Sequence, residues 1–528
     1  MHRALAQRDI LSHVFGQLAD EWDQTHMYHP DRARPKVTLR SAGLTCRSFQ
    51  GPALDALWRT IDGSMLPLLR LIPNFRNIEG VWNLVGPVTG SMLLRYRVHA
   101  SRVRKIRIHK HELLIKANVY TTLRRALGSA LLPSLQELRC SFDHASPALC
   151  VLVTPTLLHV HIYLSWTREY VHSQEHSPHL YRLQTQVVET FLYDLLDNAP
   201  CLRRLNLKGN ISSGVPSHIL PGFTQLNCLT LAPSFRTGSP EYYPLRLTCE
   251  DFLAFSSIAS LATLNLGLHG VEIPEDADPI KFSCLRELSL WGTPHSMHTV
   301  LNLLRPTEVE KLRLLVGGPE PYDHCQSLFQ SIAFPTLLDI ELTILSRPMN
   351  DVTDPDHRDA LSLFASLLRC RRLKRVKVDM LMFAPISADD TMLLSMAEAW
   401  PKLVELDLTF TDGSSTMPTI RSLGVFSARC PDLQQLSISV DANSPFPASG
   451  DLPICHHTLR WLQIWADEGH KIKDPVEVAQ WICTLFPSVQ DVSVPGDEKE
   501  GDVKRMVKAF QAMRTVHEQQ SVQSNHLP

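Results

Sequence analysis

The sequence predicts an α/β solenoid, in which short parallel strands form an inner wall and helices pack outside it. A six-residue pattern with apolar first, fourth and sixth positions recurs between residues 103 and 494. Proline often stands two residues before this pattern, and helix-like stretches separate its copies. Because proline ends a helix and favours an extended segment, these observations indicate one strand–helix unit repeated along the chain.

Residues 1–75 lack the repeat and predict three short helices. The first places five apolar residues at helical spacing: Ile10, Leu11, Val14, Phe15 and Leu18. The second helix aligns Leu39, Ala42, Cys46 and Phe49, and the third opens at Pro52 and aligns Leu54, Leu57, Trp58 and Ile61. Three short helices bury little surface alone, so part of this apolar face is expected to meet a partner.

The repeated pattern occurs in fourteen copies, here called repeat cores. Five read strictly L-x-x-L-x-L and begin at Leu202, Leu226, Leu261, Leu285 and Leu403. Looser cores begin at Val103, Leu135, Leu157, Val309, Leu337, Leu373, Leu433, Leu459 and Val489. Stacked neighbours are expected to share one continuous core, since a single unit cannot bury its own apolar face. The arrangement is a leucine-rich-repeat solenoid, a horseshoe with a parallel inner sheet and outer helices, over residues 76–500.

Helices are predicted between the cores, for example from Val187 and from Arg358. Another begins with Asp474 as N-cap, Pro475 at the first position and Glu477 in a capping box. The long interval at residues 166–186 is polar and predicts a loop.

Residues 501–528 predict a C-terminal helix and a tail. Five apolar residues fall on one helical face: Val503, Met506, Val507, Phe510 and Met513. We expect this helix to cap the last repeat, because an open solenoid end would expose its core to water. The polar residues 517–528 predict a disordered tail.

The N-terminal segments ILSHVF, LRSAGLTCRSF and ALDALWRTI resemble the F-box, in particular the F-box-like region of fungal, basidiomycete-type F-box proteins with leucine-rich repeats. The chain departs from that pattern at Arg8-Asp9, where the family has Pro-Glu, and in a long loop after the first helix. The resemblance implies the substrate-recognition subunit of an SCF-type (cullin-RING) E3 ubiquitin ligase. Its F-box docks on a Skp-type adaptor in the cullin complex, and its repeats hold a protein substrate.

By motif match, the residues that the resemblance assigns to the adaptor are Ile10, Leu11, Val14, Phe15, Leu18, Leu44, Phe49 and Trp58. The same side chains also suit the core of a three-helix module, so both interpretations stay open. A second hypothesis for the whole chain is a leucine-rich-repeat interaction scaffold outside ubiquitin transfer, in which the N-terminal helices only cap the solenoid.

Composition excludes several classes of function. The 528 residues are 44% hydrophobic and 20% charged, which is ordinary for a folded soluble protein. Lys and Arg total 52 against 54 Asp and Glu, so no general attraction to nucleic acid or membrane is expected. The twelve cysteines form no C-x-x-C pair, and no signal peptide or long apolar run occurs. We therefore expect reduced thiols in a cytoplasmic and/or nuclear protein.

No motif of a nucleophile, a phosphate loop or a metalloprotease is present, so the sequence predicts a non-catalytic subunit without a cofactor. His172, His176 and His179 lie in the polar interval, where a solvated loop is expected rather than a metal site. A basic stretch runs from Arg95 to Lys116 and predicts a solvated strand, with an acidic protein segment as the simplest partner. His159 and His161 alternate on one strand and should face the concave side.

The concave face is the expected substrate site, and its candidates are Trp461, Gln463, Trp465, Arg375, Lys377, Glu405 and Asp407. Exposed aromatic residues are typical of binding hot spots, so we expect the substrate to be anchored at the two tryptophans. Charged strands would orient it. The alternative is that the segment after Gly496 folds over both rings. The chain is expected to act as a monomer within the ligase complex.

Overall fold

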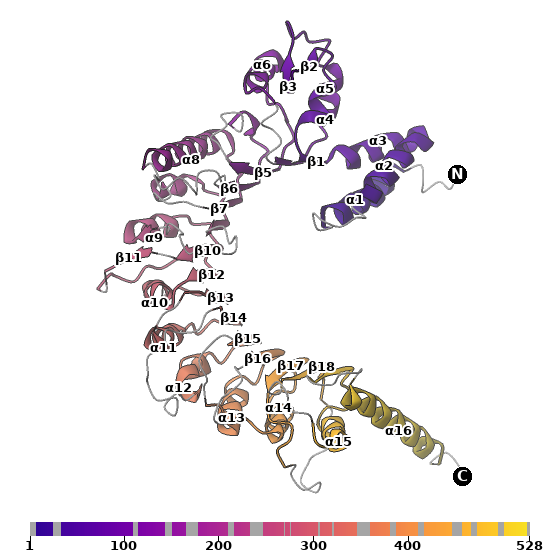
Figure 1. Ribbon diagram of the computed structural model, residues 1–528, viewed down its shortest axis with the longest axis vertical. Helices are drawn as coiled ribbons and strands as arrows, with labels where there is room; N and C mark the ends of the chain where they lie inside the picture. Colours follow the sequence, from indigo (N-terminus) through magenta and orange to yellow (C-terminus); the bar gives the residue numbers. More distant parts are fainter. Residues whose placement is uncertain are drawn as a thin grey trace. The chain divides into compact units, whose positions relative to one another are not determined.

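The computed structural model describes residues 7–24, 33–108, 115–142, 150–164, 178–209, 216–232, 246–268, 270–274, 276–304, 307–318, 321–345, 360–380, 387–409, 417–445, 457–465, 472–494 and 501–524. Its contacts divide the chain into two compact units, Met1–Leu245 and Arg246–Pro528. Each unit contains a run of parallel strands whose order follows the sequence, together with helices (Figure 1).

The first unit contains six of the parallel strands. They are β1 (Thr60–Gly63), β4 (Lys105–Ile108), β5 (Glu137–Phe142), β6 (His159–Leu164), β7 (Arg204–Gly209) and β8 (Cys228–Ala232). Each pairs in parallel with the next along this series. The rows of the ladder join equivalent positions of successive repeats, as in Ile106↔Leu138 and Val160↔Leu205.

The second unit contains nine parallel strands. They are β10 (Thr263–Leu268), β12 (Glu287–Gly292), β13 (Lys311–Val316), β14 (Asp339–Ile344), β15 (Arg375–Asp379), β16 (Glu405–Thr409), β17 (Gln435–Ser439), β18 (Trp461–Trp465) and β19 (Asp491–Ser493). These pair in the same way. All fourteen predicted cores form strands, and the leucine-rich-repeat solenoid is confirmed.

The apolar positions of each repeat core build the interior. In the third strict core, Leu261, Leu264 and Leu266 are at most 1% exposed. The residues between them point to the opposite side of the strand, because successive side chains alternate. These alternating positions, here called the polar face, carry the charged and aromatic residues discussed below.

Strand β1 was not expected, because the sequence analysis placed residues up to 75 in the helical module. Thr60 pairs with Lys105, which makes Trp58-x-x-Ile61-x-Gly63 a fifteenth copy of the pattern. Its first position is Trp and its sixth is Gly, so the apolar spacing is masked. Ile61, expected on the third helix, is 5% exposed in this strand.

The first unit has helices α1 (Arg8–Gln24), α2 (Ala33–Thr45), α3 (Arg47–Trp58), α4 (Leu66–Leu69), α5 (Leu94–Ala100), α6 (Asn118–Leu127) and α8 (Pro178–Asn198). Short 3₁₀ turns, η4 (Cys150–Leu152) and η5 (Ser217–Gly222), replace helices in two repeats. The helix predicted from Val187 is confirmed within α8, but α8 begins at Pro178, so residues 178–186 are helical rather than loop. The rest of the predicted loop, with His172 and His176, lies outside the described residues.

The second unit has helices α9 (Cys249–Ser256), α10 (Pro294–Leu303), α11 (Tyr322–Ser331), α12 (Ala360–Phe364), α13 (Asp390–Ala399), α14 (Leu423–Arg429), α15 (Pro475–Leu485) and α16 (Asp502–Ser524), with turns η7 (Leu367–Arg369) and η8 (Ile420–Ser422). In the helix predicted from Arg358, the described part forms a short helix, α12, followed by the 3₁₀ turn η7. Asp474 caps α15 as predicted, because its side chain accepts hydrogen bonds from the backbone N–H groups of Val476 and Glu477.

The predicted second and third N-terminal helices were divided at the wrong place. Cys46 is extended (φ −156°, ψ 162°) and ends α2, so Cys46 and Phe49 belong to the start of the third helix. That helix begins at Arg47, and Pro52 lies inside it rather than at its start. The apolar spacing continues through Cys46, so the sequence pattern did not indicate that α2 ends there.

Two small sheets were not predicted. β2 (Phe75–Ile78) and β3 (Val81–Leu84) form an antiparallel hairpin, whose turn residues Glu79 and Gly80 both have positive φ. β9 (Arg246–Thr248) pairs in parallel with β11 (Gly270–Glu272). The Thr248 and Asp251 side chains form a capping box at the start of α9.

The C-terminal helix α16 packs against α15 and β19. Val503 and Val507 are buried, and the Gln511 side chain donates hydrogen bonds to the carbonyls of Pro487 and Val489. Met513, expected on the packed face, is 58% exposed, because the helix has passed the last strand there. The helix continues to Ser524, into the stretch for which disorder was predicted.

Candidate functional site

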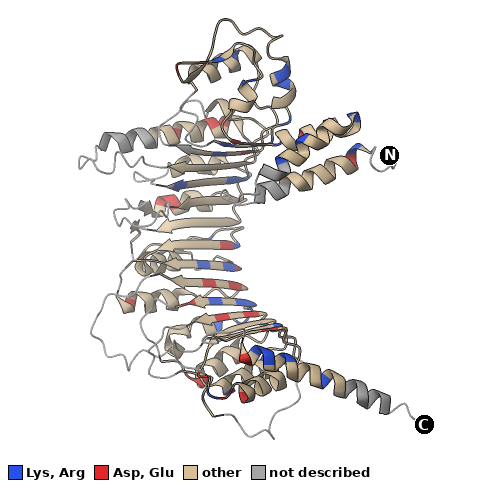
Figure 2. Ribbon diagram, turned by 45° about the vertical axis from the view of Figure 1, so that its right-hand side comes forward, with Lys and Arg blue, Asp and Glu red and all other residues tan. Residues whose placement is uncertain are grey.

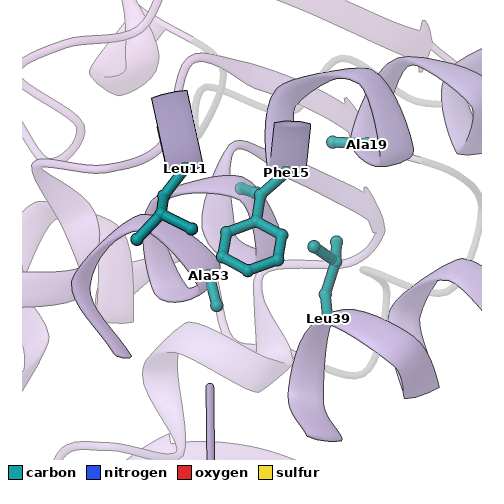
Figure 3. Close-up of a cluster of buried hydrophobic side chains, with 6 residues drawn as sticks. Leu11, Phe15, Ala19, Leu39 and Ala53 are labelled. Atoms are coloured by element: carbon teal, nitrogen blue, oxygen red, sulfur yellow. The ribbon is translucent and has the colours of Figure 1, made fainter. Parts of the chain in front are cut away.

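Helices α1–α3, here called the N-terminal module, have an apolar core of their own (Figure 3). Its buried residues are Leu11, Phe15, Ala19, Leu39, Ala53 and Ala56. The rings of Phe15 and Phe49 meet edge to face, with centroids 5.6 Å apart. Small residues allow α2 and α3 to approach closely, since a Cβ added to Gly43 would lie 3.4 Å from the Cβ of Ala53.

The structure separates the eight adaptor candidates into three groups, which are buried, half-buried and exposed. Leu11 and Phe15 are 2% and 6% exposed, so they form the interior of the module and offer no docking surface. Leu18, Phe49 and Trp58 are half-buried.

The remaining candidates are exposed. Ile10 and Val14 on α1 are 40% and 46% exposed, and Leu44 on α2 is 80% exposed. Val37, which the sequence analysis did not single out, is 61% exposed on α2. The sequence pattern did not indicate Val37 as a candidate, because Lys36, Thr38 and Arg40 beside it are polar or basic. Because other residues fill the core of the module, the side chains of Ile10, Val14, Val37 and Leu44 remain exposed to solvent.

The module joins the first repeat without a linker. One residue, Arg59, separates the end of α3 from β1. The Asp55 carboxylate pairs with Arg102 and lies 3.6 Å from Arg8, and the ring of Trp58 packs against that of His99 at 4.6 Å. An open cavity of about 670 Å³ lies at this junction. Burial and the neighbouring Arg102 lower the pKa of His99.

The polar face of β4–β7 is rich in cations. The parallel register forms one row of Lys105, Glu137, His159 and Arg204, and a second row of Arg107, Arg139, His161 and Asn206. Glu137 lies between two cations, with Lys105 Nζ at 3.9 Å and Arg139 in direct contact. His159 and His161 face this side, as predicted from their alternation.

His161 is held neutral in this cationic setting. Burial, with a smaller contribution from Arg139, lowers its pKa from 6.5 to about 4. Its Nδ1 lies 2.7 Å from the side-chain nitrogen of Asn206. Burial also lowers the pKa of His159. At neutral pH the two imidazoles therefore add hydrogen-bonding groups but no charge to this face.

The polar face of β12–β16 carries more charges, and both signs are well represented. One row reads Glu287, Lys311, Asp339, Arg375 and Glu405. The next row reads Arg313, Glu341, Lys377 and Asp407.

The signs alternate along both rows, and this arrangement is here called the charge ladder (Figure 2). Lys311 pairs with Glu287 at 2.6 Å, Arg313 pairs with Glu341 at 3.3 Å, and Arg375 pairs with Asp339.

Four of the predicted substrate-binding residues therefore belong to the charge ladder: Arg375, Lys377, Glu405 and Asp407. The other three lie on β18, where Trp461, Gln463 and Trp465 share the polar face and are half-buried. Trp465 donates a hydrogen bond from Nε1 to the hydroxyl of Ser437 at 2.9 Å. Residues 495–500, which include Gly496, lie outside the described part of the chain.

The described cysteines and metal-ligating side chains bear on whether this chain could supply a nucleophile or a metal site. Eleven cysteines are described, and all are free thiols. Burial raises the pKa of Cys370 to about 11 and that of Cys430 to about 12, which makes these thiols poor nucleophiles. No group of three or more metal-ligating side chains occurs within the described ranges. Among the helices described, none is long and apolar enough to cross a membrane.

Comparison with known proteins gives matches only among solved structures. No family model matches the chain. No curated protein matches it. The complex of Rad7 and Elc1 from yeast is similar over 94% of this chain and 90% of that chain, with 12% identity and a TM-score of 0.31. The LRIM1/APL1C complex is similar over 80% of this chain and 64% of that chain, with 11% identity and a TM-score of 0.25.

Proposed function

We propose that this chain is an F-box-like substrate-recognition subunit of an SCF-type ubiquitin ligase. In this proposal the N-terminal module docks on a Skp-type adaptor, which links the chain to a cullin, and the repeats bind a protein substrate. Other subunits transfer ubiquitin, so this chain needs no nucleophile, metal or cofactor. It acts as one copy per complex, in the cytoplasm and/or the nucleus.

The exposed apolar residues of the module are the observation that supports docking. Leu11 and Phe15 already fill the module's core, whereas Ile10, Val14 and Leu44 remain in solvent. Apolar side chains gathered on a small helical module are typical of a surface that a partner covers. Phe15 is no longer an adaptor candidate, because its ring is buried between the helices.

The adaptor proposal predicts that Val14→Asp combined with Leu44→Asp abolishes capture of a Skp-type adaptor. Both positions are exposed, so the charges disrupt an apolar interface without entering the core. We expect recovery of the adaptor from a mixture of purified proteins to fall to less than about a tenth of wild type.

Leu253→Asp is the matched control, since Leu253 is 54% exposed on α9. It should leave adaptor capture unchanged. Circular dichroism of both variants verifies that the helices remain folded. Undiminished capture by the Val14→Asp, Leu44→Asp variant would contradict the ligase proposal and favour the second hypothesis, a repeat scaffold whose N-terminal helices only cap the array.

A further inference from the structure

The polar face of β4–β7 concentrates positive charge (Figure 2). Its cations are Lys105, Arg107, Arg139, Arg204 and Lys208, and its one carboxylate is Glu137. Glu137 is already flanked by Lys105 and Arg139. Asp62 on the neighbouring β1 stands opposite Arg107 in the register. Two carboxylates cannot neutralise five cations, so this face keeps a net positive potential.

Two of the five cations lie on β7. Arg204 is exposed and Lys208 is half-exposed, and within the described residues neither forms an ion pair. In the register, Lys208 stands next to Tyr163, whose ring is 43% exposed. Lys208 thus borders an exposed aromatic residue, and Arg204 lies at the other end of the same strand face, beside His159.

The dimensions of this face fit a short extended peptide. Neighbouring strands are about 4.8 Å apart, so β4–β7 span about 14 Å. An extended chain advances about 3.3 Å per residue, so four or five residues cross the four strands. Carboxylates on such a segment would reach the cations of β4, β5 and β7, which is the geometry that favours charge-assisted hydrogen bonds. Between them, β6 offers the neutral side chains of His159, His161 and Tyr163.

The same observations disfavour nucleic acid. Tyr163 is the one aromatic residue on the polar face of β4–β7, whereas single strands are usually held by several stacked rings. Glu137 stands among the cations and would repel a phosphate backbone. The whole chain carries a net charge of −2.

We propose that an acidic, extended segment of a partner protein, rich in Asp and Glu, binds across the polar face of β4–β7 and is held by Arg139, Arg204 and Lys208. The inference deepens the proposed function, on which it rests, by naming the chemistry of the substrate segment. It places that segment on the first unit rather than on the charge ladder.

The test uses the full chain and a fluorescein-labelled peptide that contains six consecutive glutamates, with fluorescence anisotropy as the readout. A peptide with glutamines at those positions is the reference ligand. We expect the glutamate peptide to bind at least about tenfold more tightly, and its affinity to fall as salt rises. Arg204→Glu combined with Lys208→Glu should weaken binding of the glutamate peptide at least about tenfold.

Arg371→Glu combined with Arg372→Glu is the matched control. Both arginines are exposed beside β15, so this variant changes the net charge by the same amount elsewhere on the chain. It should bind the glutamate peptide within about twofold of wild type. Equal weakening by the two double variants, equal affinity for the two peptides, or tighter binding of a single-stranded RNA of similar length would overturn the proposal.

Adaptor capture is measured separately on the same preparations. If the peptide fails to bind while capture persists, only the acidic-segment inference fails. If capture fails while the peptide binds, the ligase proposal fails and the acidic-segment site belongs to a scaffold.

Discussion

The polar face of β4–β7 and the charge ladder of β12–β16 are built from the same repeat but differ in what their charges do. In the ladder each cation stands opposite an anion of the next strand, as Glu341 does between Arg313 and Lys377. On β7, by contrast, Arg204 stands beside His159 and Cys228, and Lys208 beside Tyr163 and Ala232, so neither cation has an anion opposite it. The comparison teaches that a face keeps cations available for a partner where its charges are unbalanced and no anion stands opposite them.

The same comparison bears on Trp461 and Trp465. They lie on the polar face of β18, two strands beyond the end of the ladder. Three ion pairs, Lys311–Glu287, Arg313–Glu341 and Arg375–Asp339, occupy most of the ladder's charges. The larger share of affinity in the second unit is therefore expected to come from these aromatic rings. Binding at β18 should therefore resist salt, whereas binding at β4–β7 should weaken with it.

The largest predicted effect is on substrate retention. Trp461→Ala combined with Trp465→Ala should speed dissociation of a protein held by the second unit at least about tenfold, because aromatic anchors commonly contribute 2 kcal/mol or more. The measurement is the wash-off rate of proteins captured from cells in which the proteasome is inhibited. Arg375→Glu combined with Lys377→Glu should mainly slow their association. Unchanged wash-off from the tryptophan variant would show that the rings belong to the core.

A smaller effect concerns pH and His161, which faces Arg139, Glu137, His159 and Lys208. Its folded pKa of about 4 lies below the unfolded value of 6.5. The unfolded chain therefore binds the proton first, and stability present above pH 6.5 is lost as the pH falls towards 4. The loss is on the order of 2 kcal/mol at most after solvent screening.

His161→Gln tests this pH dependence, because glutamine is neutral and can still form a hydrogen bond with Asn206. The urea-unfolding midpoint of the variant should fall less than that of wild type between pH 7.5 and pH 4.5. An identical fall in both proteins would show that His161 does not contribute to acid sensitivity.

The smallest predicted effect is a difference in stability between a charge reversal in the charge ladder and one on β4–β7. Glu341→Lys places three cations in one row and should lower the free energy of unfolding by about 1 kcal/mol. Arg204→Glu, the matched reversal on β7, should change it by less than about 0.5 kcal/mol, since Arg204 is exposed and has no ion pair among the described residues. The shift of the urea midpoint measures both. If both substitutions lowered the free energy of unfolding equally, the two faces would not differ in how much their charges contribute to stability.

Periodicity predicted the repeat fold because every repeat core must fill the same interior positions. Leu202 and Leu205, for example, are buried as their spacing requires. The pattern failed at β1, where Gly63 stands at the sixth position in place of an apolar side chain and Trp58 and Ile61 also fit the spacing of a helix. It also missed the helix break at Cys46, since an extended residue need not interrupt apolar spacing.

The candidate sites were harder to predict. Helical spacing places Val14 and Phe15 on neighbouring parts of one face, and only the packing of α2 and α3 shows that Phe15 is buried and Val14 exposed. The sequence also identified Arg375 and Asp407 as charged surface residues. Their neighbours depend on how one strand aligns with the next, so the ladder became visible only in the structure.

The direct passage from α3 into β1 has a mechanical consequence. Only Arg59 lies between α3 and β1, and Asp55 and Trp58 contact Arg102 and His99 just before β4. These contacts restrict rotation of the N-terminal module relative to the first repeats. This junction would therefore set the orientation, relative to β4–β7, of a protein bound to α1–α3. Under the proposed function, this junction would restrict which lysines of a substrate bound on β4–β7 come within reach of the ubiquitin-transferring subunits.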